Sequence, residues 1–66
     1  KMITIEHIRA IDQGIERVSR DYPIENGYEI TADLEWVRVY DASTGTLKAE
    51  WDVREGEYGD SEEWES

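Results

Sequence analysis

Acidic side chains recur at strand spacing in the middle of this chain, and they are the residues best suited to do chemistry. Glu29, Asp33 and Glu35 alternate with other residues, and Thr31 fills the gap in their series. In a β-strand, residues two apart lie on one face at intervals of about 6.6 Å. The spacing predicts a near-linear row with carboxylates at three of four places. Because one strand of duplex DNA carries a charge about every 3.4 Å, this row reaches at best about half of that density.

Further acids follow this row in the second half of the chain. They are Glu50, Asp52, Glu55, Glu57, Asp60, Glu62 and Glu63. Together with the row, these acids can bring the density of negative charge closer to that of a phosphate backbone. Trp64 stands among the last acids, and acidic segments with aromatic residues can fold on a basic, partly apolar groove. We therefore predict all these acids as partner-binding residues, with Trp64 as an apolar anchor.

No residue pattern indicates catalysis, metal binding or a cofactor. His7 is the only histidine, and the chain has no cysteine. A zinc site or a nucleophilic triad needs partners that this sequence does not offer, and the C-terminal acids lack the spacing of a calcium-binding loop. No glycine-rich loop for phosphate is present. We expect a protein that is not an enzyme and that holds no metal or cofactor.

The balance of charge excludes several classes of partner. The 66 residues include 17 acidic and seven basic ones, which gives a formal net charge of -10. A chain of this charge does not bind nucleic acid or an anionic membrane directly, so a charged partner must be basic. No apolar run approaches the roughly 20 residues that span a bilayer. We expect a soluble, cytoplasmic protein.

The first segment has the periodicity of an amphipathic helix. Thr4 can cap it, and Pro23 disfavours helical backbone at the residue before it, so a helix of about 17 residues should end near Asp21. Its apolar stripe, at steps of three and four residues, is Ile8, Ile11, Ile15, Val18 and Tyr22. Gly14 lies beside the stripe and costs about 1 kcal/mol relative to alanine inside a helix. We interpret it as a bare patch that lets the helix approach a sheet closely.

After Gly27 the period changes from that of a helix to that of strands. Apolar and polar residues alternate over 28–35 and over 46–53, and 36–40 is rich in strand-forming residues. The segment 41–45 has the composition of a hairpin loop. No glycine or proline separates 28–35 from 36–40, so either one long strand or two strands remain compatible with this stretch.

The hairpin loop sets an expected register between its two strands. Counting back from the loop pairs Tyr40 with Leu47, Arg38 with Ala49 and Trp36 with Trp51. In this register Val37 and Val39 lie on the sheet face opposite the two tryptophans, where they offer a surface for a homodimer. The expected core joins the helix stripe to Ile30, Leu34, Leu47, Trp51 and either Val37 or Val39.

Together these segments predict an α+β fold. An N-terminal amphipathic helix packs on a two- or three-stranded antiparallel sheet, in a single domain over residues 2–53. The segment 54–66 carries six acids and no sustained period, and we predict that it is a flexible acidic tail.

Size, acidity and the lack of catalytic motifs make the chain similar to phage and plasmid counter-defence proteins. These include anti-CRISPR and anti-restriction inhibitors, several of which mimic nucleic acid. The resemblance is one of composition, and it implies a small non-enzymatic inhibitor that blocks a basic groove of a nucleic-acid-processing protein. The alternative is an interaction module or small subunit that uses an apolar sheet face or its helix, with acidity for solubility. Salt adaptation also fits the two lysines, and it predicts unfolding at low salt.

Overall fold

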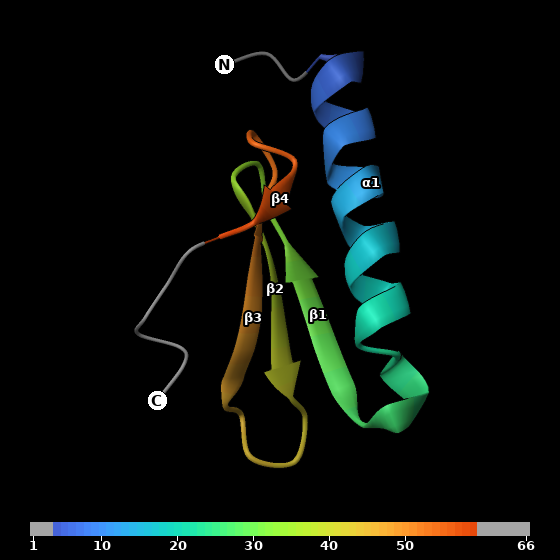
Figure 1. Ribbon diagram of the computed structural model, residues 1–66, viewed down its shortest axis with the longest axis vertical. Coiled ribbons are helices and arrows are strands. Elements are labelled where there is room, and N and C mark those ends of the chain that lie inside the picture. Colours follow the sequence, from blue (N-terminus) through green and yellow to red (C-terminus); the bar gives the residue numbers. More distant parts are fainter. Residues whose placement is uncertain (1–3, 60–66) are drawn as a thin grey trace.

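The structure of the protein, a computed structural model, describes residues 4–59 and has an α+β architecture (Figure 1). Its elements are α1 (Ile5–Asp21), the short 3₁₀ helix η1 (Ile24–Asn26), β1 (Tyr28–Ala32), β2 (Trp36–Asp41), β3 (Leu47–Asp52) and β4 (Glu57–Tyr58). The strands form one antiparallel sheet in the order β1-β2-β3-β4, and α1 packs on one of its faces. The sheet therefore has four strands, and the prediction of two or three was too low. No helix within residues 4–59 is long and apolar enough to cross a membrane.

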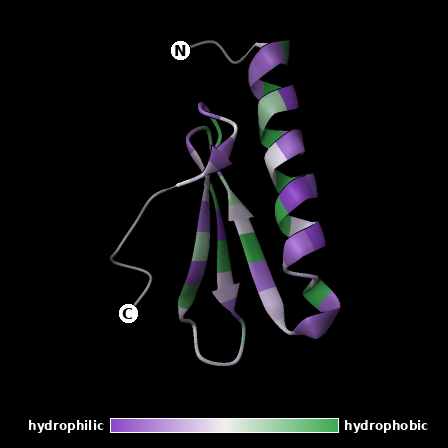
Figure 2. Ribbon diagram, viewed as in Figure 1, coloured by the Kyte–Doolittle hydropathy of each residue, from purple (hydrophilic) through white to green (hydrophobic). Residues whose placement is uncertain are grey.

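The helix begins and ends where the sequence predicts. The Thr4 side chain accepts a hydrogen bond from the backbone N–H of His7 at 3.2 Å, and the His7 ring accepts one from the Thr4 backbone N–H at 3.4 Å. This reciprocal pair satisfies two donors that a helix start otherwise leaves open. At the other end, the Tyr22 N–H donates to the Val18 carbonyl, and Pro23 follows. Figure 2 shows the hydrophobic segments of α1 turned toward the sheet.

The core lies between α1 and the two central strands. Its buried residues are Val18, Val37, Val39, Ala49, Trp51 and Val53. Gly14 is buried directly over Trp51: a Cβ added at Gly14 would lie 2.6 Å from Cδ1 of the indole. The close approach of helix and sheet that we expected at Gly14 is confirmed.

The predicted register of the hairpin is wrong beyond its first pair. Tyr40 does pair with Leu47, but the register shifts between Val39 and Tyr40, so that Val37 pairs with Trp51. One extra residue in β3, Lys48, produces this shift, as in a β-bulge. Every pair after the bulge is displaced by one residue.

The bulge changes which side chains form the core. Val37 and Val39 are fully buried under α1 together with Trp51, whereas Trp36 lies on the opposite face of the sheet. Val37 and Val39 therefore cannot form the homodimer surface that we predicted. Leu47 was also expected in the core, but it shares the outer face with its partner Tyr40.

Two further apolar residues expected in the core are exposed. β1 ends at Ala32, so Leu34 lies in the turn that follows and is 40% exposed. Ile8 belongs to the first half of α1 and is 51% exposed. The packed part of the helix stripe therefore begins at Ile11 and continues through Ile15 and Val18.

The sheet continues into the stretch for which we predicted an acidic tail. Glu57 pairs with Asp52 and Tyr58 pairs with Trp51, and these pairs make β4 the edge strand beside β3. The Tyr58 hydroxyl donates to Asp21 at 2.7 Å, which ties β4 to the end of α1. Residues 54–59 thus pack as part of the sheet layer. The predicted site residues Asp60, Glu62, Glu63 and Trp64 lie outside the described residues.

Candidate functional site

The two layers of the protein carry very different charge. The helix segment 4–22 has four acidic and three basic residues, whereas 23–59 has nine acidic residues against three basic ones. The sheet layer therefore has a net charge of -6 and the helix layer a net charge of -1. The outer face and turns of the sheet are the candidate functional site.

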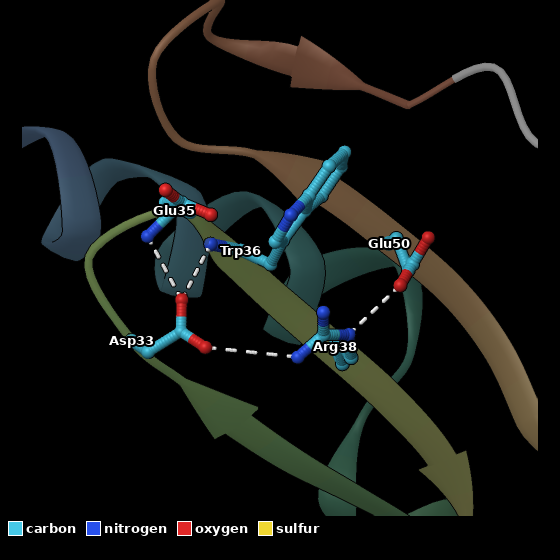
Figure 3. A network of polar contacts seen from close by, with 5 residues as sticks. All are labelled: Asp33, Glu35, Trp36, Arg38 and Glu50. Carbon is cyan, nitrogen blue, oxygen red and sulfur yellow. Dashed lines mark hydrogen bonds and ion pairs between the residues drawn. The ribbon is translucent and has the colours of Figure 1, made fainter.

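The outer face is centred on three residues of β2, which we call the outer row: Trp36, Arg38 and Tyr40. Their neighbours Val37 and Val39 point into the core, so the outer row faces away from α1. All three side chains are half-buried. Figure 3 shows Trp36 and Arg38 projecting from the outer side of the sheet.

Each aromatic residue of the outer row has an acid directly across from it. Trp36 pairs with Asp52 of β3, and Tyr40 pairs with Glu29 of β1. Side chains opposite each other on antiparallel strands lie about 5 Å apart at Cβ. The face therefore combines aromatic rings with adjacent carboxylates.

Arg38, the central cation of this face, is held by two of the predicted acids. Its Nε donates to Oε2 of Glu50 at 2.8 Å, and its Nη1 lies 3.6 Å from Oδ2 of Asp33 (Figure 3). The hydrogen bond to Glu50 raises the pKa of Arg38 above its ordinary value. Its positive charge is therefore largely compensated within the molecule. In turn, the carboxylates of Glu50 and Asp33 are engaged by Arg38 and are less available to a partner.

Asp33 also holds a turn together, and so does a further predicted acid, Asp52. Oδ1 of Asp33 accepts from the backbone N–H groups of Trp36 and Glu35, each at 2.8 Å, and these bonds lower the pKa of Asp33. Oδ1 of Asp52 accepts from the N–H groups of Arg54 at 2.9 Å and Glu55 at 3.1 Å. The straight carboxylate row predicted from Glu29 to Glu35 does not form, because β1 ends at Ala32 and Asp33 turns back to cap its own loop.

The remaining predicted acids within the described residues have no side-chain partner there. They are Glu29, Glu35, Glu55 and Glu57, and all four are exposed. The N–H of Val53 donates to the carbonyl of Glu35 at 3.0 Å and joins the β1–β2 turn to the β3–β4 turn. The two turns thus bring together a cluster that we call the acidic rim, which comprises Asp33, Glu35, Asp52, Glu55 and Glu57.

Sequence reasoning missed the outer row as part of the site. The alternation of Trp36, Arg38 and Tyr40 with buried valines was visible in the sequence, but the assumed register placed Trp36 with the core residue Trp51. The bulge at Lys48 has no glycine or proline to mark it. The residue types of the outer row could have identified it, since Trp, Tyr and Arg are the residues most enriched at binding hot spots.

The described part of the chain gathers no metal-binding group of three or more His, Asp or Glu side chains. Two hollows among these residues are open and shallow, and one of them, of about 430 Å³, lies between η1 and the β2–β3 hairpin. Comparison with known proteins found no matching family model, no matching curated protein and no matching solved structure.

Proposed function

We propose that this chain is a small acidic inhibitor, without enzymatic activity, that binds a basic groove of a nucleic-acid-processing protein and blocks access of DNA or RNA. The observation that carries the proposal is the segregation of charge, -6 in the sheet layer against -1 in the helix layer. Acidity that served solubility alone would need no such asymmetry, because the helix also has a broad exposed face.

The geometry of the sheet layer supports such a role. Glu29, Glu35, Glu55 and Glu57 are exposed and make no ion pair with any residue in 4–59. Strands lie about 4.8 Å apart, and same-face residues of one strand lie about 6.6 Å apart. Carboxylates spread over neighbouring strands therefore approach the charge density of a phosphate backbone more closely than one row can.

The mechanism is occupancy by charge. When nucleic acid binds a basic groove, the lysine and arginine side chains of the groove replace counterions condensed on the phosphates, and carboxylates at similar spacing compete for the same side chains. Affinity should therefore fall steeply as salt rises. The composition, like that of the counter-defence inhibitors of phages and mobile elements, is in keeping with this mode of action.

The test is capture of the partner from the source cell followed by competition with purified components. The captured protein should bind labelled DNA or RNA, and this chain should displace that nucleic acid and bind the captured protein more tightly as salt is lowered. Glu55→Lys with Glu57→Lys reverses two charges of the acidic rim, and we expect it to weaken displacement at least about tenfold.

Asp12→Lys with Glu16→Lys is the matched control, since it makes the same change of charge on exposed positions of α1. We expect this control to have a much smaller effect. Equal losses from the two double variants, or a captured partner that binds no nucleic acid, would overturn the proposal.

A second candidate function is an interaction module that uses an apolar surface of the helix. Ile5 and Ile8 are 68% and 51% exposed in the first half of α1, although Ile8 belongs to the stripe that was predicted to pack. In this case Ile8→Lys should abolish partner capture, and the charge reversal at Glu55 and Glu57 should leave it unchanged. The inhibitor proposal predicts the opposite pattern.

A further inference from the structure

The proposed function leaves open which part of the acidic layer makes the central contact. Resting on that function, we propose that the outer row of β2, Trp36, Arg38 and Tyr40, is the centre of the binding surface and that it accepts an arginine-rich segment of the partner protein.

The outer row has the composition and position of an interface centre. It lies in the middle of the sheet, and among residues 4–59 no helix or strand covers this face, since α1 packs on the other one. Its Trp, Arg and Tyr are the residue types that dominate binding energy at protein interfaces. Around them lie the acids Glu29, Glu50 and Asp52, which supply a charged border.

Trp36 is held in place before any partner arrives. A Cβ added at Gly59 would lie 2.9 Å from Cζ3 of the indole, so the ring already packs closely over this glycine. The backbone N–H of Gly59 in turn donates to the carbonyl of Glu50 at 2.8 Å. An aromatic side chain with a fixed orientation loses little conformational entropy on binding, which favours its use as an anchor.

The chemistry of the face favours arginine over lysine in the partner. A guanidinium group can stack on an aromatic ring while it forms a two-pronged hydrogen bond with a carboxylate, and an ammonium group cannot do both. The cross-strand pair of Tyr40 with Glu29 offers such a combination of ring and carboxylate, because Glu29 is exposed and makes no ion pair within residues 4–59. Beside Trp36, Asp52 offers only its Oδ2, since its Oδ1 accepts from the N–H groups of Arg54 and Glu55.

The chain builds the same arrangement for one of its own arginines. The guanidinium of Arg17 lies 5.9 Å from the ring centroids of both Trp51 and Tyr58, and its Nε lies 3.1 Å from Oδ2 of Asp21. On the outer face itself, Arg38 rests between two carboxylates. These internal examples indicate the geometry that an arginine of the partner can adopt beside Trp36 or Tyr40.

Charge selects against the other possible occupants of this face. A second copy of the chain would bring another net charge of -10 to it. Like charges repel, so a basic segment is the occupant that this surface attracts.

The experiment is an NMR titration of the full chain with synthetic oligoarginine and oligolysine peptides of equal length, at about 50 mM and about 500 mM salt. We expect the indole N–H of Trp36 and the amides of 36–40 to shift most, and oligoarginine to bind at least about fivefold more tightly than oligolysine. Trp36→Ala should weaken oligoarginine binding about tenfold.

Two further variants keep the test independent of a folding defect at Trp36. Arg38→Gln removes the central cation and frees Glu50 and Asp33, and we expect it to raise the affinity for oligoarginine about threefold. Ile24→Ala is the matched control, because Ile24 is a 63% exposed apolar residue away from the sheet face, and it should change affinity less than twofold.

The outcomes separate this inference from the function on which it rests. If both peptides bind equally and the shifts map to the acidic rim, the outer row is not the centre and charge occupancy stands. If neither peptide binds even at low salt, both proposals fall. If sedimentation detects a dimer that Trp36→Ala dissociates, a second copy occupies the face and the inference is overturned.

Discussion

At the scale of single residues, the contact between Gly14 and Trp51 sets the distance between helix and sheet. A Cβ at position 14 would lie 2.6 Å from Cδ1 and 2.8 Å from Nε1 of the indole, and 3.2 Å from a methyl group of Val37. Trp51 is 5% exposed and Val37 is fully buried, so neither can move into solvent. The missing side chain of Gly14 is therefore part of the packing.

Gly14→Ala should destabilise the protein even though alanine is the better helix former. The helix propensity gains about 1 kcal/mol, whereas overpacking a core costs typically about 1 to 3 kcal/mol and more when the neighbour is rigid. Because Trp51 and Val37 are buried and have little room to move, we expect a cost in the upper part of this range, about 2 to 3 kcal/mol, and so a net loss of about 1 to 2 kcal/mol. Urea unfolding followed by tryptophan fluorescence measures it. Gln13→Ala, at the exposed neighbouring position, is the control and should be neutral or slightly stabilising. A Gly14→Ala protein as stable as the original would contradict the packing argument.

Also at the residue scale, Asp21 links stability to pH. The Tyr58 hydroxyl at 2.7 Å and Arg17 at 3.1 Å both stabilise the ionised carboxylate, so the pKa of Asp21 lies below its ordinary value. Because the folded-state pKa is lowered, the stabilisation is fully present above the ordinary pKa of about 4, and it is lost as the pH falls through the folded-state pKa.

Tyr58→Phe removes the largest cause of that shift and should lower the melting temperature near neutral pH. The difference from the original protein should narrow as the pH falls from about 5 to about 2, because the original then loses the same interaction. Tyr28→Phe is the control and should give a difference that does not depend on pH. Circular dichroism melts across this range measure both, and a constant gap for Tyr58→Phe would refute the linkage.

At the scale of elements, the β1–β2 turn depends on one carboxylate. Asp33 accepts hydrogen bonds from two backbone N–H groups and also faces Arg38. Asp33→Ala should therefore cost about 1 to 2 kcal/mol, whereas Asp33→Asn keeps the acceptor oxygen and should cost less than half of that. Glu35→Ala in the same turn should stay within about 0.5 kcal/mol. Chemical denaturation ranks the three variants, and an Asp33→Ala protein no less stable than Glu35→Ala would exclude the capping role.

The helix could be predicted from the sequence because its signals are local. The Thr4 cap, the stripe with steps of three and four, and Pro23 each act within a few residues, and the structure has the predicted end at Asp21. The register of β2 with β3 depends instead on where β3 accommodates an extra residue. Nothing local marks Lys48 as a bulge. Counting back from the loop therefore gave a register in which every pair beyond the bulge was wrong by one residue.

The same distinction explains which parts of the candidate site could be foreseen. The identity of the acids follows from composition, and Glu29, Glu35, Glu55 and Glu57 are exposed as a binding role requires. The internal uses of the other acids depend on tertiary placement. The partnership of Glu50 with Arg38 needs the shifted register, which places these two residues opposite each other on the outer face.

At the scale of the whole molecule, the fold separates two tasks between its layers. α1 and the inner side chains of the sheet provide the core, while most of the net charge lies on the outer side and at the turns. Because the helix layer is nearly balanced in charge, repulsion acts mainly among the acids of the sheet layer. The ion pairs of Arg38 with Glu50 and Asp33 offset part of it at the centre.

This arrangement predicts how stability responds to salt. We expect the protein to remain folded at about 10 mM salt and its melting temperature to rise as sodium chloride screens the sheet layer, with little further change once the Debye length falls to about 3 Å at 1 M. If screening is the cause, sodium chloride and sodium sulfate should raise the melting temperature equally when they are compared at the same low ionic strength. Sulfate strengthens apolar burial mainly at high concentration. Glu55→Lys with Glu57→Lys should flatten the low-salt rise, and Asp12→Lys with Glu16→Lys should do so much less, because the helix layer contributes little net charge. Unfolding at low salt, monitored by circular dichroism, would instead identify the acidity as salt adaptation and remove the physical basis for a charge-based binding surface.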